Sequence, residues 1–151
     1  MSEFRIENTL GYRVNRCGIA MRQDLRRRFN EQGHSITPEE WIILNRLWEN
    51  DGLTQNEISQ KTIKDKTTVT RFLSKMEEDG LIQRKSSKED KRVNHVHLTA
   101  KGKKLKELLI PIAKELMSNA ADGISQEHLR ITLETLKQIE INLSNLDSLQ
   151  D

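Results

Sequence analysis

Apolar residues recur at every third or fourth position over most of the chain, which is the spacing of one face of an α-helix. One such stripe runs through residues 6–29, and two others run through residues 105–116 and 129–146. These stripes carry more apolar surface than a small central unit can cover. We therefore expect a second copy of the chain to bury the remainder.

Three helix starts lie close together between the first and second stripes. Thr37 and Thr54 are each followed three residues later by a glutamate, which is the spacing of a capping box. Asp65 precedes a third helix as its N-cap, and that helix is predicted to extend to residue 79. The helix that starts at Thr54 is short, because it must end near residue 62.

Apolar and polar residues alternate after the third helix, which is the period of a β-strand. Residues 81–87 and 93–99 are predicted to form a hairpin around the loop 88–92. Thr99 then caps a long helix, in which Pro111 removes one backbone hydrogen bond and is expected to cause a kink.

The predicted order is helix, helix, short helix, helix, hairpin, long helix, long helix, so the chain is mainly α with a small β-hairpin. A short helix, a tight turn, a second helix and a hairpin form a winged helix-turn-helix, whose second helix enters the major groove of DNA. We interpret residues 1–151 as a single domain. The winged helix DNA-binding region occupies about residues 36–100, and residues 1–33 and 101–151 supply N- and C-terminal dimerisation helices.

Positive charge is concentrated in the middle of the chain. The formal net charge of the whole chain is +2, but residues 61–104 carry +7, residues 1–60 carry −1 and residues 105–151 carry −4. A basic segment between slightly acidic flanks is typical of a surface that binds a polyanion such as DNA. A basic face that is merely solvated is the alternative.

The predicted helix over residues 65–79 has an apolar side and a polar side. Four apolar residues cluster within about 100° at 3.6 residues per turn and are expected to face the core: Val69, Phe72, Leu73 and Met76. The opposite side carries short hydroxyls with arginine and lysine, which suit hydrogen bonds to phosphates and base edges. The candidate DNA-binding residues in and just before this helix are Lys64, Lys66, Thr67, Thr68, Thr70, Arg71, Ser74 and Lys75.

The loop of the predicted hairpin is also basic. Its candidate DNA-binding residues are Lys88, Asp90, Lys91 and Arg92. Such a loop can lie along the backbone or in the minor groove, and Asp90 can brace Arg92 by a charge-assisted pair. A flexible solvated loop is the alternative.

The sequence matches one known pattern over nearly the whole chain, most specifically in short strings between residues 53 and 102. They are LTQ at 53–55, TTVTR at 67–71, GLI at 80–82, DKR at 90–92 and LTAKG at 98–102. With them the sequence resembles the MarR family of bacterial transcription regulators. The resemblance implies a homodimer held by the first, fifth and sixth helices, which binds pseudo-palindromic operators on double-stranded DNA through paired fourth helices. It also implies that Asp90 orients Arg92 toward the minor groove, and that a small aromatic or lipophilic effector alters DNA affinity, as in a repressor.

Cys17 is the only cysteine, which excludes an intrachain disulfide and suits a reducing compartment. It lies on the first apolar stripe, so we expect it to be buried and structural. Its position also resembles that of the reactive cysteine in organic-hydroperoxide sensors of the MarR family. Those sensors have several neighbouring tyrosines, whereas this chain has only Tyr12. A redox-sensing regulator that acts through Cys17 is therefore kept as an alternative.

Other classes of function find little support in the sequence. The chain has no glycine-rich phosphate loop, nucleophile motif or metal triad, so we expect no enzyme activity and no cofactor. His95 and His97 point the same way from a predicted strand but have no third metal ligand nearby. A winged helix used for protein contact is a further alternative, which the polar face of residues 65–79 argues against. No apolar run approaches the ~20 residues of a membrane span, so a cytoplasmic protein is expected.

Overall fold

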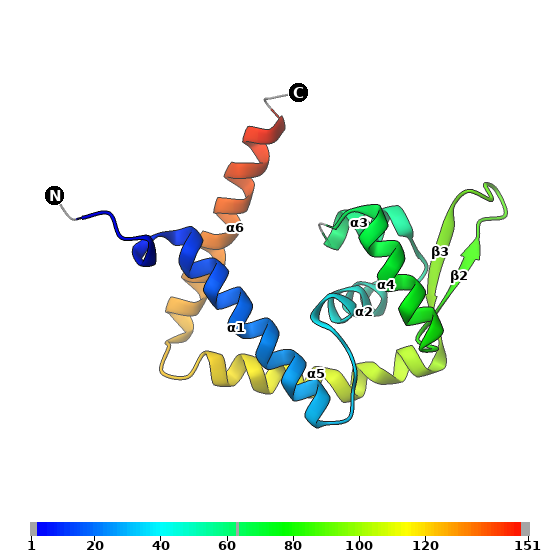
Figure 1. Cartoon of the computed structure of the whole chain (residues 1–151), viewed down its shortest axis with the longest axis horizontal. Coiled ribbons are helices and arrows are strands. Elements are labelled where there is room, and N and C mark those ends of the chain that lie inside the picture. The colour runs from blue at the N-terminus through cyan, green and yellow to red at the C-terminus, as the bar shows by residue number, and fades with distance from the viewer. Residues whose placement is uncertain (1–2, 63, 149–151) are drawn as a thin grey trace. The chain divides into compact units, whose positions relative to one another are not determined.

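The computed structural model describes residues 3–62 and 64–148, with side chains up to residue 144. Contacts divide the chain into two compact units, residues 1–114 and 115–151, and helix α5 contributes to both. The elements in chain order are η1 Ile6–Asn8, α1 Leu10–Glu31, α2 Pro38–Glu49, β1 Leu53–Thr54, α3 Gln55–Thr62, α4 Lys66–Glu78, β2 Ile82–Ser86, β3 Asn94–Leu98, α5 Ala100–Ala120 and α6 Gln126–Ser148 (Figure 1).

The helix starts are the ones that the capping residues predict. Thr37 Oγ1 accepts a hydrogen bond from the Glu40 amide at 3.2 Å. Thr54 Oγ1 accepts from the Glu57 amide at 3.2 Å, while Glu57 Oε2 accepts from the Thr54 amide at 3.0 Å, which completes a capping box. These bonds satisfy amides that have no partner within the helix.

The wing is a three-stranded antiparallel sheet in the order β1-β3-β2, so the predicted two-stranded hairpin was incomplete. Leu53 of β1 pairs with Val96 of β3, and Ile82 of β2 pairs with Leu98 of β3. Strand β1 has only two residues, which is too short to produce an alternating pattern in the sequence. Its pairing anchors the central strand β3 to the segment between α2 and α3.

The core of the first unit is formed by the last turns of α1 together with α2, α3, α4, the sheet and the first part of α5. Its largest fully buried apolar residues include Phe29, Ile43, Leu44, Leu47, Ile58, Leu73, Met76, Ile82, Val96 and Leu109. Val96 and Leu98 point inward from β3, as the alternation predicts. Helix α5 continues through Pro111, so that residue does not end it.

Much of the apolar stripe on α1 is exposed in the single chain. Leu25 and Phe29 are buried, whereas Leu10 is 52% and Val14 45% exposed. Cys17 is exposed as well, so the expectation that it is buried is wrong for one chain. The reason is that the stripe extends beyond the core that one chain can supply.

Candidate DNA-binding interface

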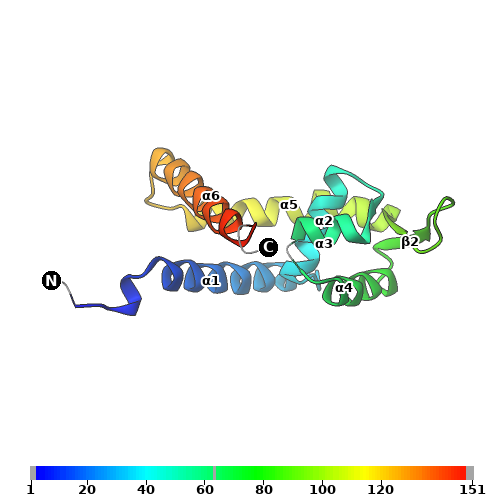
Figure 2. The same ribbon diagram turned by 90° about the horizontal axis from the view of Figure 1, so that it is seen from above.

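Helix α4 is held in the winged helix by one buried side. Val69, Leu73 and Met76 are at most 1% exposed, and Phe72 is half-buried. Figures 1 and 2 show α3 beside α4, with the hairpin β2-β3 beyond it. The predicted DNA-binding residues that are exposed in and before α4 are Lys64, Lys66, Thr67, Thr70, Arg71, Ser74 and Lys75. The helix thus presents short hydroxyls and cations to solvent.

The first turn of α4 is fixed by Asp65. Its Oδ1 accepts from the Thr68 amide at 2.7 Å, and its Oδ2 accepts from the Thr68 hydroxyl at 2.9 Å. The hydrogen bond from the Thr68 amide holds the pKa of Asp65 below its usual range, with the Thr68 hydroxyl adding to the effect. The Thr68 hydroxyl is therefore part of the cap, and its proton is used within the first turn of α4.

Thr70 lies in a chain of hydrogen bonds that joins α4 to the base of the wing. Its Oγ1 donates to the Lys66 carbonyl at 2.8 Å and accepts from Gln55 Nε2 at 3.3 Å. Gln55 Oε1 in turn accepts from Asn94 Nδ2 at 3.3 Å. Because the one hydroxyl proton is used within the helix, Thr70 has only acceptor capacity left toward a ligand.

The guanidinium of Arg71 lies over the ring of Phe72, with Cζ 5.4 Å from the ring centroid. A cation near an aromatic face is attracted by the ring quadrupole. The half-buried ring therefore restricts the arginine while its donors remain open to solvent.

Arg92 in the wing is braced by Asp90 through two parallel hydrogen bonds. Arg92 Nε lies 3.1 Å from Asp90 Oδ1, and a second guanidinium nitrogen lies 3.1 Å from Oδ2. These bonds from Arg92 hold the pKa of Asp90 below its usual range. The Arg92 side chain is nevertheless 90% exposed, so it is oriented without being covered.

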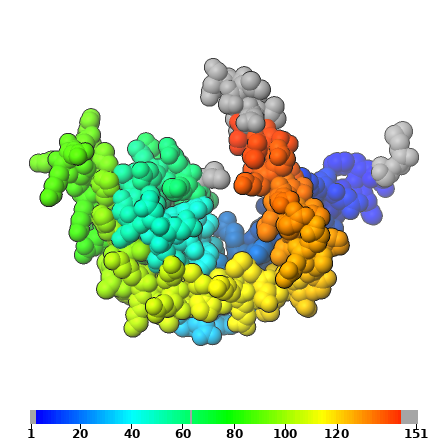
Figure 3. Space-filling model, turned by 180° about the vertical axis from the view of Figure 1, so that it is seen from behind, coloured from blue at the N-terminus to red at the C-terminus, as the bar shows by residue number. Residues whose placement is uncertain are grey.

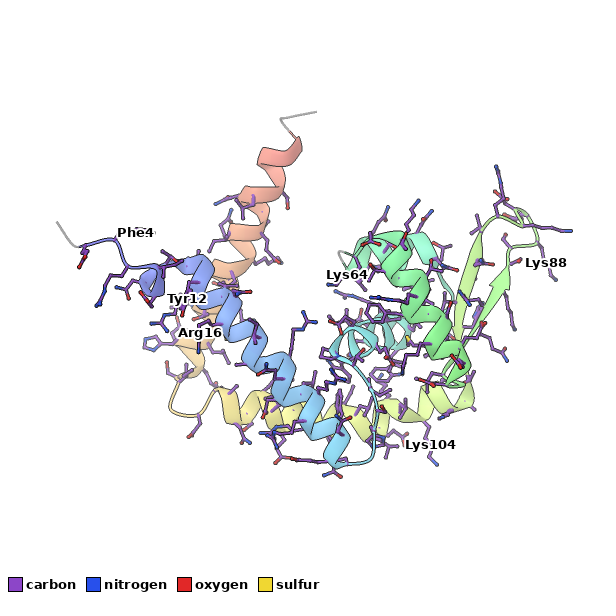
Figure 4. All side chains as sticks on the ribbon, viewed as in Figure 1. Phe4, Tyr12, Arg16, Lys64, Lys88 and Lys104 are labelled. Carbon is purple, nitrogen blue, oxygen red and sulfur yellow. The ribbon has the colours of Figure 1, made fainter. Side chains whose placement is uncertain are left out.

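Two lysines of the predicted DNA-binding elements can be located in Figure 4. Lys64 precedes α4, and Lys88 lies near the tip of the hairpin loop in Figure 4, whereas Lys104 on α5 lies away from both. The same loop projects as the green extension of the space-filling view in Figure 3. A helix with an adjacent basic projection can follow a groove and the phosphates beside it.

Comparison with known proteins agrees with this geometry. The MarR family model matches residues 36–93. The organic hydroperoxide resistance transcriptional regulator of Bacillus subtilis (strain 168) is 34% identical over 112 residues, which are 74% of this chain and 70% of that protein. The chain belongs to the MarR family.

Solved structures share the fold of this MarR-family chain. Reduced AbfR bound to DNA has a TM-score of 0.77 at 23% identity, and the match covers 94% of each chain. CouR from Rhodococcus jostii RHA1 bound to p-coumaroyl-CoA has a TM-score of 0.79 at 17% identity, covering 91% of this chain and 95% of that one. Both the family resemblance and the mainly α winged helix fold are confirmed.

Lys75 differs from the other predicted DNA contacts because its ammonium lies near two carboxylates. Nζ is 3.1 Å from Asp79 Oδ2 and 3.6 Å from Oε1 of the fully buried Glu40. Burial raises the pKa of Glu40, and the charge of Lys75 only partly opposes that effect. The hydrogen bond to Asp79, together with the charge of Glu40, raises the pKa of Lys75. We expect Lys75 to contribute less to DNA binding than Lys66.

The acidic end of α4 is explained by the sheet, which the sequence did not reveal. Glu77 Oε2 accepts from the Arg84 amide at 2.8 Å, and Oε1 lies 3.4 Å from the Arg84 guanidinium. The bond from the Arg84 amide lowers the pKa of Glu77. Glu77 therefore fastens the last turn of α4 to β2, although a carboxylate there opposes the helix dipole.

His95 and His97 of β3 both lie beside Gly52, in the turn before β1. His95 Nδ1 lies 2.9 Å from the Gly52 carbonyl, which links β3 to the turn before β1. Within the described residues, no group of three or more histidine, cysteine, aspartate or glutamate side chains is placed to hold a metal ion.

Among the described helices, none is long and apolar enough to cross a membrane.

Proposed function

We propose that this MarR-family transcriptional regulator binds pseudo-palindromic operators as a homodimer, with α4 in the major groove and the loop of residues 88–92 at the minor groove. The observation that carries this is one surface that combines the open polar side of α4 with the braced Arg92. The likeness to AbfR, whose structure was solved bound to DNA, supports it.

The exposed residues fall into two proposed roles. Arg71 reads a base edge, because its fork of donors matches the acceptors of guanine. Thr67 and Ser74 make shorter contacts to bases or phosphates. The lysines bind phosphates, which carry affinity without sequence information; they are Lys64, Lys66, Lys88 and Lys91.

The Asp90–Arg92 pair gives the sharpest test of the wing's role. Arg92→Ala should weaken operator binding most at A·T-rich sites, where a narrow minor groove concentrates negative potential. Asp90→Ala should reproduce part of that loss, and the double variant should be no weaker than Arg92→Ala, because Asp90 acts through Arg92. Operator fragments selected from genomic DNA by the purified protein supply the probe for fluorescence anisotropy.

Two outcomes of these measurements would count against the proposal. Additive losses in the double variant would show that Asp90 does not act through Arg92. Unchanged operator affinity in both Arg71→Ala and Arg92→Ala would overturn the assignment of this surface to DNA.

We further propose that the protein acts in the cytoplasm, without enzyme activity, as a repressor that responds to a small aromatic or lipophilic effector. The likeness to CouR, solved with p-coumaroyl-CoA, supports an aromatic class of ligand. Release of the operator fragment by such a compound at equilibrium, with no turnover of the compound, is the expected result.

A second candidate is regulation through Cys17, favoured by the exposure of this residue and by the 34% identity to an organic hydroperoxide resistance regulator. In this reading the Cys17 thiolate attacks the hydroperoxide, gives a sulfenic acid and releases the alcohol. Loss of operator binding with cumene hydroperoxide in the wild type but not in Cys17→Ser would establish it. Insensitivity of both proteins would leave Cys17 a structural residue.

A further inference from the structure

Glu40, in the first turn of α2, is a buried acidic residue that the proposed DNA contacts do not account for. Its side chain is 0% exposed, and its Oε1 accepts from the Thr37 hydroxyl at 3.2 Å. Its Oε2 is buried and has no hydrogen-bond partner in the described structure. A buried carboxylate is unfavourable unless a cation or several donors compensate its charge. Glu40 therefore depends on a nearby cation to remain ionised.

The ammonium of Lys75 supplies a cation from α4. Its Nζ lies 3.6 Å from Glu40 Oε1 and 3.1 Å from Asp79 Oδ2, and the Lys75 side chain is 51% exposed. Lys75 follows Arg71 by four residues, so the two side chains leave α4 on the same side, one turn apart. One lysine thus lies between a buried carboxylate and the surface that is proposed to meet DNA.

A DNA phosphate and the Glu40 carboxylate compete for this ammonium. A lysine carries a point charge on a flexible stem, so it can turn from one anion to another by a change of rotamer. Burial raises the pKa of Glu40, and the charge of Lys75 opposes that effect. When Lys75 turns toward a phosphate, the burial of Glu40 remains while its compensation is reduced, which favours the uncharged acid.

We propose that Glu40 and Lys75 form a proton-linked switch of DNA binding, in which the Glu40 carboxylate takes up a proton from solvent as Lys75 turns to a phosphate of the bound duplex. The proposal rests on the DNA-binding function proposed above and adds a dependence on pH. Because linkage is reciprocal, a lower pH favours the protonated Glu40, releases Lys75 and strengthens DNA binding. A higher pH keeps Lys75 at Glu40 and weakens it.

Other titratable side chains lie near this pair, and they come from several elements. A hollow of about 370 Å³ includes among its lining residues His34, Lys75, Asp79 and Lys101. The Lys101 ammonium donates to the Asp79 carbonyl at 2.9 Å, which holds it at the end of α4. On the side of α1, Arg22 pairs with Glu39. Histidine is the residue type in this group that changes charge between pH 5 and 8, so His34 is the rival source of a pH effect.

Glu40→Gln is the first test, because glutamine has the shape of the protonated acid and carries no charge at any pH. In fluorescence anisotropy at pH 8 and constant ionic strength, the variant should bind the operator fragment and an unrelated duplex several-fold more tightly than the wild type, since Lys75 is free for a phosphate. This advantage should shrink as pH falls to 5.5, because the wild type takes up the proton. Weaker binding by the variant at pH 8, or parallel pH profiles of the two proteins, would overturn the switch.

A matched pair of lysine variants on α4 tests the link without changing a buried residue. Lys75→Gln removes the ammonium for which the two anions compete, so adding Glu40→Gln to it should no longer change the affinity at any pH. Lys66→Gln removes an equal charge from the first turn of α4. It should weaken binding at every pH and keep the pH dependence of the wild type. An effect of Glu40→Gln that persists without Lys75 would contradict the proposed link.

His34→Gln is the control for the rival titration. The variant should keep the difference in pH profile between the wild-type Glu40 and Glu40→Gln, because the switch does not use the imidazole. If the difference disappears with His34, the titrating group is the histidine and the proposal is wrong.

Calorimetry measures the proton itself. Operator binding at pH 7 in two buffers of different ionisation enthalpy should show more proton uptake by the wild type than by Glu40→Gln, and equal uptake would refute the switch. If Arg71→Ala and Arg92→Ala weaken operator binding while Glu40→Gln leaves the pH profile unchanged, the switch fails and the DNA-binding function stands. If the wild type binds no duplex at any pH, both fail.

Discussion

Arg71 and Lys88 are both exposed cations, but their surroundings give them different tasks. Arg71 lies over Phe72 on a rigid helix, whereas Lys88 lies near the tip of a loop. Arg71→Ala should cost about 1–3 kcal/mol on the operator and relax the preference at one position in each half-site. Lys88→Ala should weaken all duplexes alike and lower the slope of log Kd against log salt by about 1.

The control for this comparison is Lys104→Ala, which removes an equal charge from α5, away from the interface (Figure 4). Its operator affinity and salt slope should stay close to those of the wild type when measured by anisotropy at several salt concentrations. If Arg71→Ala weakens unrelated DNA as much as the operator, Arg71 is an anchor and does not read sequence.

Glu40 shows how one buried carboxylate makes stability depend on pH. Burial raises the pKa of Glu40 above the ordinary 4.5, so the folded protein keeps a proton on this carboxyl group at a pH where the unfolded chain has released it. The resulting stability is present at low pH and is lost as pH rises through the raised pKa. Glu40→Gln removes this titration. The free energy of unfolding of the variant should therefore improve relative to the wild type as pH rises from about 4 to 8.

Urea denaturation at each pH measures the difference, and Glu49→Gln, an exposed change on the same helix, controls for the loss of one charge. A wild type that instead gains stability over Glu40→Gln with rising pH would show that attraction to Lys75 outweighs burial. The Glu40–Lys75 contact would then be a net stabilising pair.

At the scale of helices and strands, the sequence predicted those elements whose signals are local. The capping residues Thr37, Thr54 and Asp65 predicted the starts of α2, α3 and α4 because each cap bonds an amide three residues away. The two-sided character of α4 followed from its periodicity. These features concern neighbouring residues, so no tertiary information was needed.

The missed features all depend on residues far apart in the chain. Strand β1 exists because Leu53 pairs with Val96, and the Gln55–Asn94 bond joins residues 39 positions apart. The role of Glu77 toward β2 also requires the tertiary structure. The exposure of Cys17 was missed because an apolar stripe does not say which of its residues one chain can cover.

The junction of the sheet with α5 allows a sharp prediction. A Cβ added at Gly102 would lie 2.2 Å from the Leu81 carbonyl oxygen and 3.1 Å from Leu98 Cδ2, and the backbone of Leu81 leaves little room to adjust. Trp48 Nε1 also donates to the Gly102 carbonyl at 3.0 Å, so a shift of α5 would disturb that bond. Gly102→Ala should destabilise the fold by about 1–3 kcal/mol or more.

Thermal and urea denaturation of the purified variant measure this loss. Gly18→Ala is the matched control, because a Cβ there meets nothing within 4 Å and Gly18 lies inside α1, where alanine favours the helix. If Gly102→Ala is as stable as the wild type, α5 can move away from the sheet without a loss in the free energy of unfolding.

For the whole molecule, the apolar surface left exposed by each unit is the basis for expecting a dimer. Ile6, Leu10 and Val14 are 45–56% exposed in the first unit, and Leu133 and Leu143 are about 60% exposed on α6. Large apolar side chains that gather in the open on a helix face are unfavourable in water and mark an interface. A second copy is the occupant that also places two α4 helices on a pseudo-palindromic operator.

Light scattering at micromolar concentration should therefore give twice the 17.6 kDa of one chain. Removal of residues 125–151 deletes α6 and should cause aggregation or loss of operator binding, because the apolar surface that α6 covers in the dimer becomes exposed.

The double variant Leu133→Glu and Leu143→Glu tests the same surface in the full-length chain. Charges buried at an interface are unfavourable, so the protein should become monomeric while its helix content is kept. The monomer should then bind the operator far more weakly, since it contacts one half-site only. A truncated chain that stays soluble with full operator affinity, or a monomeric wild type, would rule out dimerisation through these helices.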